Sequence, residues 1–325
     1  MKIEKILIIR FSSIGDIVLT SPIIRCIKKQ MPEVEIHYLT KECYKNIVSN
    51  NPYITKTYTI KKSLKEITPL LKAENYSYIV DLHNNLRSTL VKSMLRCPAG
   101  SFPKLNIRKW IYVKTKNKNV MPNIHIVDRY FEAVKKIDVT NDNLGLDFFG
   151  DEKMDIPFDK YAVIVCGATH TTKQIPPKHI AKLAEKINGN IVLVGDKHDA
   201  ERLKSIDINI KSNVLNMCGK CTLAQSAYIV KNAHIVITSD TGLMHIAAAY
   251  KKNIITIWGN TTPELGMYPY IPSNKNKYIN IEVNNLLCRP CSKIGYSQCP
   301  KKDFKCMNNI NLSKIIEHTN NSLRS

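Results

Sequence analysis

The sequence lacks any apolar run of about 18 residues, the length that a membrane-spanning helix needs. Its first apolar run covers only residues 6–9 and ends at Arg10, which argues against a signal peptide. Hydrophobic residues make up 44% and charged residues 23%, as in ordinary globular proteins. These features predict a cytoplasmic protein. Its ten cysteines are then expected to be free, metal-bound or catalytic rather than paired in disulfides.

Three nucleotide-site motifs are also missing. No stretch reads Gly-x-Gly-x-x-Gly, and none has the pattern of a lysine-bearing P-loop, so neither glycine-rich phosphate cradle is expected. No Asp-x-Asp pair occurs, which leaves a metal-bridged sugar-nucleotide site unsupported. If phosphate is bound, helix N-termini and lysine side chains must hold it.

Acidic residues are scarce. Lys and Arg number 48 against 27 Asp and Glu, a net charge of +21, and residues 82–127 hold nine basic side chains and no acidic one. Such an excess suggests an anionic partner: nucleic acid, an anionic membrane surface or a phosphorylated substrate. The alternatives are a compositional drift toward lysine, since only 9 of these residues are Arg, and a merely solvated basic face.

Short β-branched runs alternate with helix-like stretches along the chain. Runs at residues 5–9, 35–39 and 78–82 recur in the second half at 162–166, 191–194, 234–238 and 254–258. Nearly unbroken apolar runs are typical of parallel strands buried on both faces. With 325 residues, the chain is predicted to be α/β, with two doubly wound domains at 1–150 and 161–325. The acidic, aperiodic stretch 151–160 is predicted to link them beside a cleft.

The first candidate site follows the first strand. Ser13, Gly15 and Asp16 lie in a tight turn that enters a helix expected over residues 16–30. Asp16 either caps this helix or presents a carboxylate that removes a proton from an incoming hydroxyl.

Two further strand-to-helix turns could bind phosphate. The loop after residue 166 carries Thr169, Thr171, Thr172 and Lys173 before a helix expected to begin at Pro177. The loop after residue 238 carries Asp240, Thr241 and Gly242, with His245 on the helix that follows. Both turns fall at one edge of the sheet, so they could hold a diphosphate between them. A threonine-rich loop without ligand and a packed core histidine are the alternatives.

A cluster of four cysteines lies near the C-terminus. Cys288, Cys291, Cys299 and Cys306 fall within 19 residues. Four thiolates suit a structural zinc ion, with an iron–sulfur cluster or free thiols as alternatives.

Four stretches carry a resemblance to a known family. Residues 8–22 read Ile-Ile-Arg-Phe-Ser-Ser-Ile-Gly-Asp-Ile-Val-Leu-Thr-Ser-Pro, and residues 81–88 read Asp-Leu-His-Asn-Asn-Leu-Arg-Ser. Residues 239–248 read Ser-Asp-Thr-Gly-Leu-Met-His-Ile-Ala-Ala, and residues 257–263 read Ile-Trp-Gly-Asn-Thr-Thr-Pro. In this order, over nearly the whole chain, they resemble glycosyltransferase family 9, the ADP-heptose:lipopolysaccharide heptosyltransferases.

The resemblance implies a GT-B fold, in which two Rossmann-like domains face a cleft. It also implies that the N-terminal domain receives the lipopolysaccharide-core acceptor and that the C-terminal domain holds the nucleotide-sugar donor. Asp16 matches the family's base, and Ser13, Gly15 and Arg87 are expected on the acceptor side. The donor residues are then Thr169, Thr171, Thr172, Lys173, Asp240, Thr241, Gly242 and His245, with Cys221 near the base and Asp199 or Glu201 at the ribose.

Two features depart from the family pattern, and the first of them bears on the donor site. Ile175-Pro176 replaces the usual aromatic-Pro after Lys173, and the four-cysteine segment occurs in only some relatives. The sequence therefore predicts an inverting, metal-independent glycosyltransferase at the inner face of the cytoplasmic membrane, with structural zinc at the four cysteines as the candidate metal. A same-fold enzyme with another donor or acceptor, and a basic nucleic-acid-binding protein with a zinc-binding tail, are the alternatives.

Overall fold

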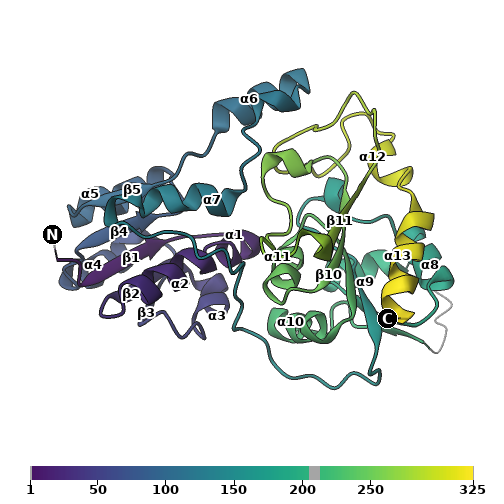
Figure 1. The fold of residues 1–325 in the computed structure, drawn as a ribbon, viewed down its shortest axis with the longest axis horizontal. Coiled ribbons are helices and arrows are strands. Elements are labelled where there is room, and N and C mark those ends of the chain that lie inside the picture. The colour runs from purple at the N-terminus through teal and green to yellow at the C-terminus, as the bar shows by residue number, and fades with distance from the viewer. Residues whose placement is uncertain (1, 205–212, 325) are drawn as a thin grey trace. The chain divides into compact units, whose positions relative to one another are not determined.

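The computed structural model describes residues 2–204 and 213–324, which form two compact units. The first unit comprises the chain up to Leu105 together with Ile124–Gly150. The second comprises Asn106–Asn123 and the chain from Asp151 onward. Figure 1 shows that each unit is built around its own sheet.

The first unit has a parallel sheet of five strands in the order β3-β2-β1-β4-β5. The central strand β1 is buried from Ile6 to Ile9, as its unbroken apolar sequence predicted. The sheet order reverses between β1 and β4, so ligands are expected where these two strands end. The strands are β1 (Lys5–Ile9), β2 (Glu35–Lys41), β3 (Lys56–Ile60), β4 (Tyr78–Asp81) and β5 (Ala99–Ser101).

The helix expected over residues 16–30 is two helices. It breaks at Thr20, whose buried hydroxyl donates to the Ile17 carbonyl at 2.7 Å and so competes with the helical ladder. The helices of this unit are α1 (Ile14–Val18), α2 (Ser21–Gln30), α3 (Lys45–Val48), α4 (Thr68–Ala73), α5 (Leu86–Leu95) and α7 (Ile126–Tyr130).

The second unit has a parallel sheet of six strands in the order β11-β10-β9-β6-β7-β8. Its order reverses between β6 and β9, which places the switch point beside the two predicted phosphate loops. Two parallel α/β sheets confirm the predicted fold class. The strands are β6 (Tyr161–Val165), β7 (Asn190–Val194), β8 (Val214–Asn216), β9 (Ile235–Ser239), β10 (Asn253–Trp258) and β11 (Tyr278–Glu282).

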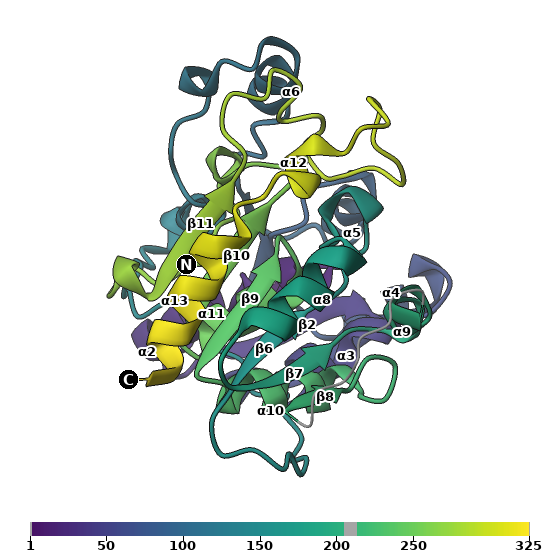
Figure 2. The same cartoon turned by 90° about the vertical axis from the view of Figure 1, so that its right-hand side faces the viewer.

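Helices cover this second sheet, and α8 and α13 lie side by side over one face (Figure 2). Ile180 of α8 and Ile315 of α13 enter the same apolar core as Ile164 of β6. Among the described residues, no helix combines the length and apolar character needed to cross a bilayer. The helices of this unit are α6 (Asn106–Thr115), α8 (Pro177–Lys186), α9 (Lys197–Lys204), α10 (Leu223–Asn232), α11 (Gly242–Ala249), α12 (Lys305–Asn308) and α13 (Leu312–Arg324).

The unit boundaries differ from the predicted domains in one segment. Residues 106–123 were assigned to the first domain from their position in the chain, whereas α6 packs on the second unit. The buried Tyr112 hydroxyl lies 2.9 Å from Thr262 Oγ1, and Lys116 Nζ donates to the Pro290 carbonyl at 2.7 Å. The expected linker begins at Asp151, which accepts hydrogen bonds from Lys231 and the Tyr250 hydroxyl.

Candidate functional site

In the first unit, Asp16 lies in the first turn of α1, just beyond the end of β1. Its Oδ2 accepts hydrogen bonds from the Ser13 amide at 3.2 Å and the Ser13 hydroxyl at 2.8 Å, a capping box across the helix start. Gly15, in the same turn, is buried. Ser13 is thus the N-cap residue, and Asp16 takes part in the cap from the third position of the helix, with its carboxylate 24% exposed. Oδ1 takes no part in the cap and is bound by another residue.

Arg10 is a site residue that sequence reasoning overlooked. Its Nη2 lies 2.7 Å from Asp16 Oδ1, and its other nitrogens donate to the Ser12 and Leu82 carbonyls. The guanidinium therefore stabilises the negative charge of Asp16 and fixes its orientation. Only its position directly after the first strand could have revealed it.

His83 follows β4, on the other side of the switch point in this sheet. Its ring contacts Phe11 edge-on, with centroids 4.9 Å apart. Burial, together with the positive charges of Arg10 and Lys104, lowers the pKa of His83 to about 4. The imidazole is therefore neutral at physiological pH and can exchange hydrogen bonds without adding charge.

Arg87 lies near this group, on the first turn of α5. It is exposed, and its guanidinium carbon lies 5.9 Å from the centre of the Phe11 ring. Arg87 also lines a surface hollow of about 410 Å³. Three lysines and one glutamate share this hollow, so its lining is strongly basic: Lys41, Lys61, Lys62 and Glu42.

In the second unit, three loops at the carboxyl ends of the strands meet at Asp240. Lys173, after β6, donates from Nζ to Asp240 Oδ2 at 2.6 Å. Thr261, after β10, donates to the same oxygen at 3.0 Å. The side chains of Lys173 and Asp240 are only 14% and 11% exposed. An ammonium group held by a carboxylate here can exchange that partner for a phosphate oxygen, because both are anionic acceptors.

The three threonines of the Lys173 loop differ in their surroundings. Thr169 and Thr171 are exposed and free to meet a ligand. Thr172 is only 2% exposed, and its hydroxyl both accepts from the Tyr296 amide at 2.8 Å and donates to the Tyr296 carbonyl at 3.1 Å. The hydroxyl of Thr172 is therefore occupied within the protein, unlike the direct phosphate ligand that was expected.

The Asp-Thr-Gly stretch forms the start of α11. Thr241 caps the helix by accepting from the Met244 amide at 3.4 Å, and Gly242 is its first residue. The N-terminal amides of this helix therefore lie directly beside Asp240. His245 is 2% exposed and lies among the buried residues of α11.

Asp199 and Glu201, the two candidates for ribose binding, differ in their exposure to solvent. The Asp199 carboxylate is buried against Gly167 and Gly195, where it bonds Arg202 at 3.1 Å. Glu201 lies on the exposed side of α9 and pairs with Lys204 at 2.7 Å. Cys221 is partly buried just before α10, with its thiol 3.5 Å from the Met154 sulfur.

The four clustered cysteines do not form the expected zinc site. Burial and the neighbouring Cys288 thiol raise the pKa of Cys291 to about 11, and burial raises the pKa of Cys306 to about 12. Over residues 2–204 and 213–324, no three His, Cys, Asp or Glu side chains converge as metal ligands, and Cys299 is a free thiol like the others.

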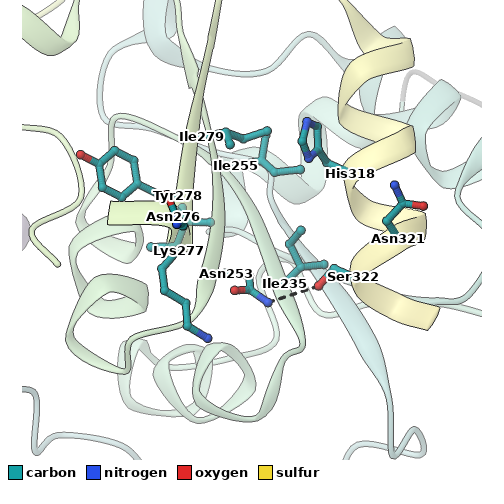
Figure 3. Close-up of a pocket in the computed structure, with 11 residues that line it drawn as sticks. Ile235, Asn253, Ile255, Asn276, Lys277, Tyr278, Ile279, His318, Asn321 and Ser322 are labelled. Carbon is teal, nitrogen blue, oxygen red and sulfur yellow. Dashed lines mark hydrogen bonds between the residues drawn. The ribbon is translucent and has the colours of Figure 1, made fainter. Parts of the chain in front are cut away.

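A separate cavity lies at the opposite edge of the second sheet. Figure 3 shows it between the starts of β9, β10 and β11 and the helix α13, with a volume of about 320 Å³. Asn253, Lys277 and His318 are among its lining residues. Asp240 and Thr261 lie at the carboxyl ends of their strands, so this cavity is not part of the site around Lys173.

Solved structures share this fold. A glycosyltransferase family 9 protein from Veillonella parvula aligns with a TM-score of 0.77, 18% identity and coverage of 100% of this chain and 99% of its own. The E. coli heptosyltransferase WaaC with ADP aligns with a TM-score of 0.69 and 20% identity, and the alignment covers 97% of this chain and 99% of that chain. The chain therefore has the GT-B fold of these enzymes. The iron-containing glycosyltransferase TibC from E. coli aligns with a lower TM-score of 0.57 and 11% identity. That alignment covers 99% of this chain and 76% of TibC.

Sequence comparison agrees with the fold. The lipopolysaccharide heptosyltransferase 1 of Campylobacter coli is 24% identical over 344 aligned positions, which cover 96% of this chain and 97% of that relative. The family model described as glycosyltransferase family 9 (heptosyltransferase) matches residues 66–301. The enzyme class that the motifs suggested is thereby confirmed, and this chain is a glycosyltransferase that belongs to glycosyltransferase family 9.

Proposed function

We propose that this enzyme transfers heptose from ADP-heptose to a lipopolysaccharide-core acceptor with inversion at the sugar C1. The observation that carries the proposal is the Lys173–Asp240 ion pair at the switch point of the second sheet. A nucleoside diphosphate binding there would take the Lys173 ammonium from Asp240 and approach the N-terminal amides of α11. Relatives named as heptosyltransferases, one of them solved with ADP, support heptose and ADP as the donor's parts.

Asp16 is proposed as the general base of this reaction. It accepts the proton of the acceptor hydroxyl while that oxygen forms a bond to C1 and the bond from C1 to the diphosphate oxygen breaks. Arg10 stabilises the ionised carboxylate and fixes its orientation, and the carboxylate is 24% exposed to an incoming hydroxyl. On the leaving side, Lys173 and the α11 amides stabilise the charge that develops on ADP.

The basic hollow of the first unit is proposed to receive anionic groups of the acceptor. Lys41, Lys61, Lys62 and Arg87 place four positive charges around it, against the single carboxylate of Glu42. A core acceptor that bears carboxylates or phosphates offers matching charges. Ser13 and Gly15, at the start of α1, are proposed to shape the acceptor side around Asp16.

Helix α6 supports the proposed peripheral association with the inner face of the cytoplasmic membrane. Ile107 and Trp110 are 77% and 61% exposed on this helix, one turn apart. Arg108, Lys109 and Lys114 lie beside them. Exposed Trp and Ile flanked by basic residues suit the interface of an anionic bilayer.

Nucleotide binding and transfer test the donor proposal together. Purified enzyme is titrated with ADP, UDP, GDP and their sugars in a thermal-shift assay, and heptose transfer is then measured with ADP-heptose. We expect ADP forms alone to raise the melting temperature. Selective stabilisation by UDP or GDP forms would instead identify a same-fold enzyme with another donor.

Lys173→Gln is the matched variant for this test. Removing the ammonium should weaken ADP binding by at least about tenfold, because hydrogen bonds to charged groups contribute about 1.5–3 kcal/mol. Lys178→Gln, on the exposed surface of α8, is the control and should bind ADP like the wild type. Equal affinities in both variants would contradict the assignment of Lys173.

A further inference from the structure

The first part of the four-cysteine segment connects two loops of the donor site. We call residues 289–296 the bridging segment. It follows β11 and contacts both the loop after β10, residues 259–262, and the loop after β6, residues 170–173. Nothing in the proposed chemistry requires these residues, yet the polar side chains of Arg289 and Ser292 are buried.

Arg289 forms the first contact. Its guanidinium is buried and donates to the carbonyls of Gly259 at 2.5 Å and Thr261 at 3.1 Å. It also donates to the Trp258 carbonyl at 3.2 Å and to Glu282 Oε2 at 2.9 Å. One side chain thus fixes the backbone of the loop whose Thr261 hydroxyl bonds Asp240.

Ser292 forms the second contact and shapes the segment itself. Its hydroxyl oxygen accepts from the Gly295 amide at 2.6 Å and from the Ile294 amide at 3.2 Å, which closes a tight turn. The same oxygen accepts from Asn260 Nδ2 at 3.2 Å. The turn is therefore anchored to the loop after β10, and it presents Tyr296 to the other loop.

Tyr296 and Gly295 complete the connection. The Tyr296 backbone exchanges hydrogen bonds with the Thr172 hydroxyl and accepts from the Thr172 amide at 3.2 Å. Gly295, at φ +127°, packs so closely on His170 that a Cβ atom would lie 2.5 Å from the His170 Cβ. Gly259 is equally confined, since its Cβ would lie 2.8 Å from the Thr172 carbonyl oxygen.

We infer that the bridging segment sets the spacing between the loop that carries Lys173 and the 259–262 loop, whose Thr261 bonds Asp240, so that Arg289 and Ser292 are positioning residues for nucleoside-diphosphate binding. The connection runs from Ser292 and Arg289 to the 259–262 loop, and through Tyr296 to the turn that ends in Lys173. This inference rests on the proposed function, because it assumes that the diphosphate binds at Lys173 and the start of α11. It also gives the segment a role that needs no metal.

Ser292→Ala is the variant that tests the inference, since it removes one oxygen atom and no group that would touch the donor. We expect the KM for the donor and the Kd for ADP to rise about five- to tenfold, the effect of one or two lost hydrogen bonds. The kcat and the KM for the acceptor should change less than about twofold, because Asp16 and the basic hollow belong to the other unit.

Thr319→Val is the matched control in the same unit. Thr319 is fully buried on α13 and donates to the Ile315 carbonyl at 2.7 Å, so its loss lowers stability in a similar way. We expect a lower melting temperature with wild-type KM values for both substrates. If Ser292→Ala does not fold, Thr172→Val is compared with Thr172→Ser, which keeps the hydroxyl and should retain donor affinity.

The outcomes separate the two proposals. A wild-type enzyme that binds ADP, with Ser292→Ala affinity within twofold of it, overturns the positioning role and leaves the proposed function intact. An equal KM increase in Thr319→Val would show that lost stability alone is responsible, which also overturns the role. A wild-type enzyme that binds no nucleotide refutes the proposed function, and the inference with it.

Discussion

At the scale of single residues, Asp16 has a structural role in the cap of α1 and a proposed chemical role as the general base. One carboxylate oxygen caps α1 through Ser13, and the other meets Arg10. Replacement by the isosteric asparagine keeps the acceptor for the cap but removes the basic carboxylate. It therefore separates the two roles.

We expect Asp16→Asn to lower the rate of heptose transfer by at least about a hundredfold, as removal of a general base typically does. ADP affinity should be unchanged, because the donor residues belong to the second unit. Transfer and ADP binding are measured in parallel, with Asp138→Asn at an exposed position as the control. Near-wild-type turnover in Asp16→Asn would disprove the base assignment.

His83 makes stability depend on pH. Its pKa is about 4 in the folded protein and about 6.5 when unfolded, so the unfolded state binds more protons between these values. The free energy of unfolding contributed by His83 is therefore fully present above about pH 6.5 and is lost as the pH falls toward 4.

A comparison of variants isolates this effect from the other histidines. Between about pH 7 and pH 5, His83→Gln should lose less stability than the wild type, as measured by urea denaturation at each pH. His318→Gln, at an exposed position, should follow the wild-type curve. Parallel curves for all three proteins would refute the buried, neutral state of His83.

At the scale of elements, apolar pattern predicts the centre of each sheet and misses its edges. The buried strands β1, β4, β6 and β9 were predicted because their residues are apolar on both faces. Strands β3 and β11 lie at sheet edges and alternate apolar with polar residues, as in Lys-Thr-Tyr-Thr-Ile, so no unbroken run marks them. The break between α1 and α2 depends on one threonine hydroxyl, which no periodicity reveals.

Some residues of the candidate site could likewise be predicted from the sequence, and others could not. Lys173 and Asp240 were predicted at one sheet edge because each follows a recognisable strand. The buried role of Thr172 and the contacts of Arg289 depend on partners over a hundred residues and about thirty residues away. Spacing within a motif carries no information on such distant partners, so these roles required the structure.

Helix α13 illustrates an element whose packing stabilises its unit. Ile315 is fully buried in the core that α13 and α8 form over the second sheet. We expect Ile315→Ala to lower the free energy of unfolding by about 2–5 kcal/mol, through lost burial and a residual cavity. Ile107→Ala, at a 77% exposed position on α6, should change it by less than about 0.5 kcal/mol in the same urea titration. Equal losses would contradict this packing.

At the scale of the whole molecule, the net charge of +21 predicts that the enzyme binds anionic membranes electrostatically. We expect it to bind vesicles that contain phosphatidylglycerol, and binding should weaken as salt is raised because exposed charges are then screened. Trp110→Ala should weaken this binding about tenfold, through the lost burial of one aromatic side chain.

The control for this measurement is Leu144→Ala, an exposed apolar position in the first unit. It should bind the same vesicles like the wild type. Equal binding of the wild type to neutral phosphatidylcholine vesicles would argue against an electrostatic contribution. Unchanged binding of Trp110→Ala would argue against α6 as the contact.

The path of the chain constrains how such enzymes can recombine. Residues 106–123 leave the first half of the sequence to pack on the second unit, where Tyr112 and Lys116 bond Thr262 and Pro290. A chimera joined at Gly150 would therefore pair a foreign α6 with the native 259–262 loop. An exchange that moves donor preference intact between two relatives must carry residues 106–123 along with the C-terminal half. Such a chimera needs two more crossovers than one with a single junction.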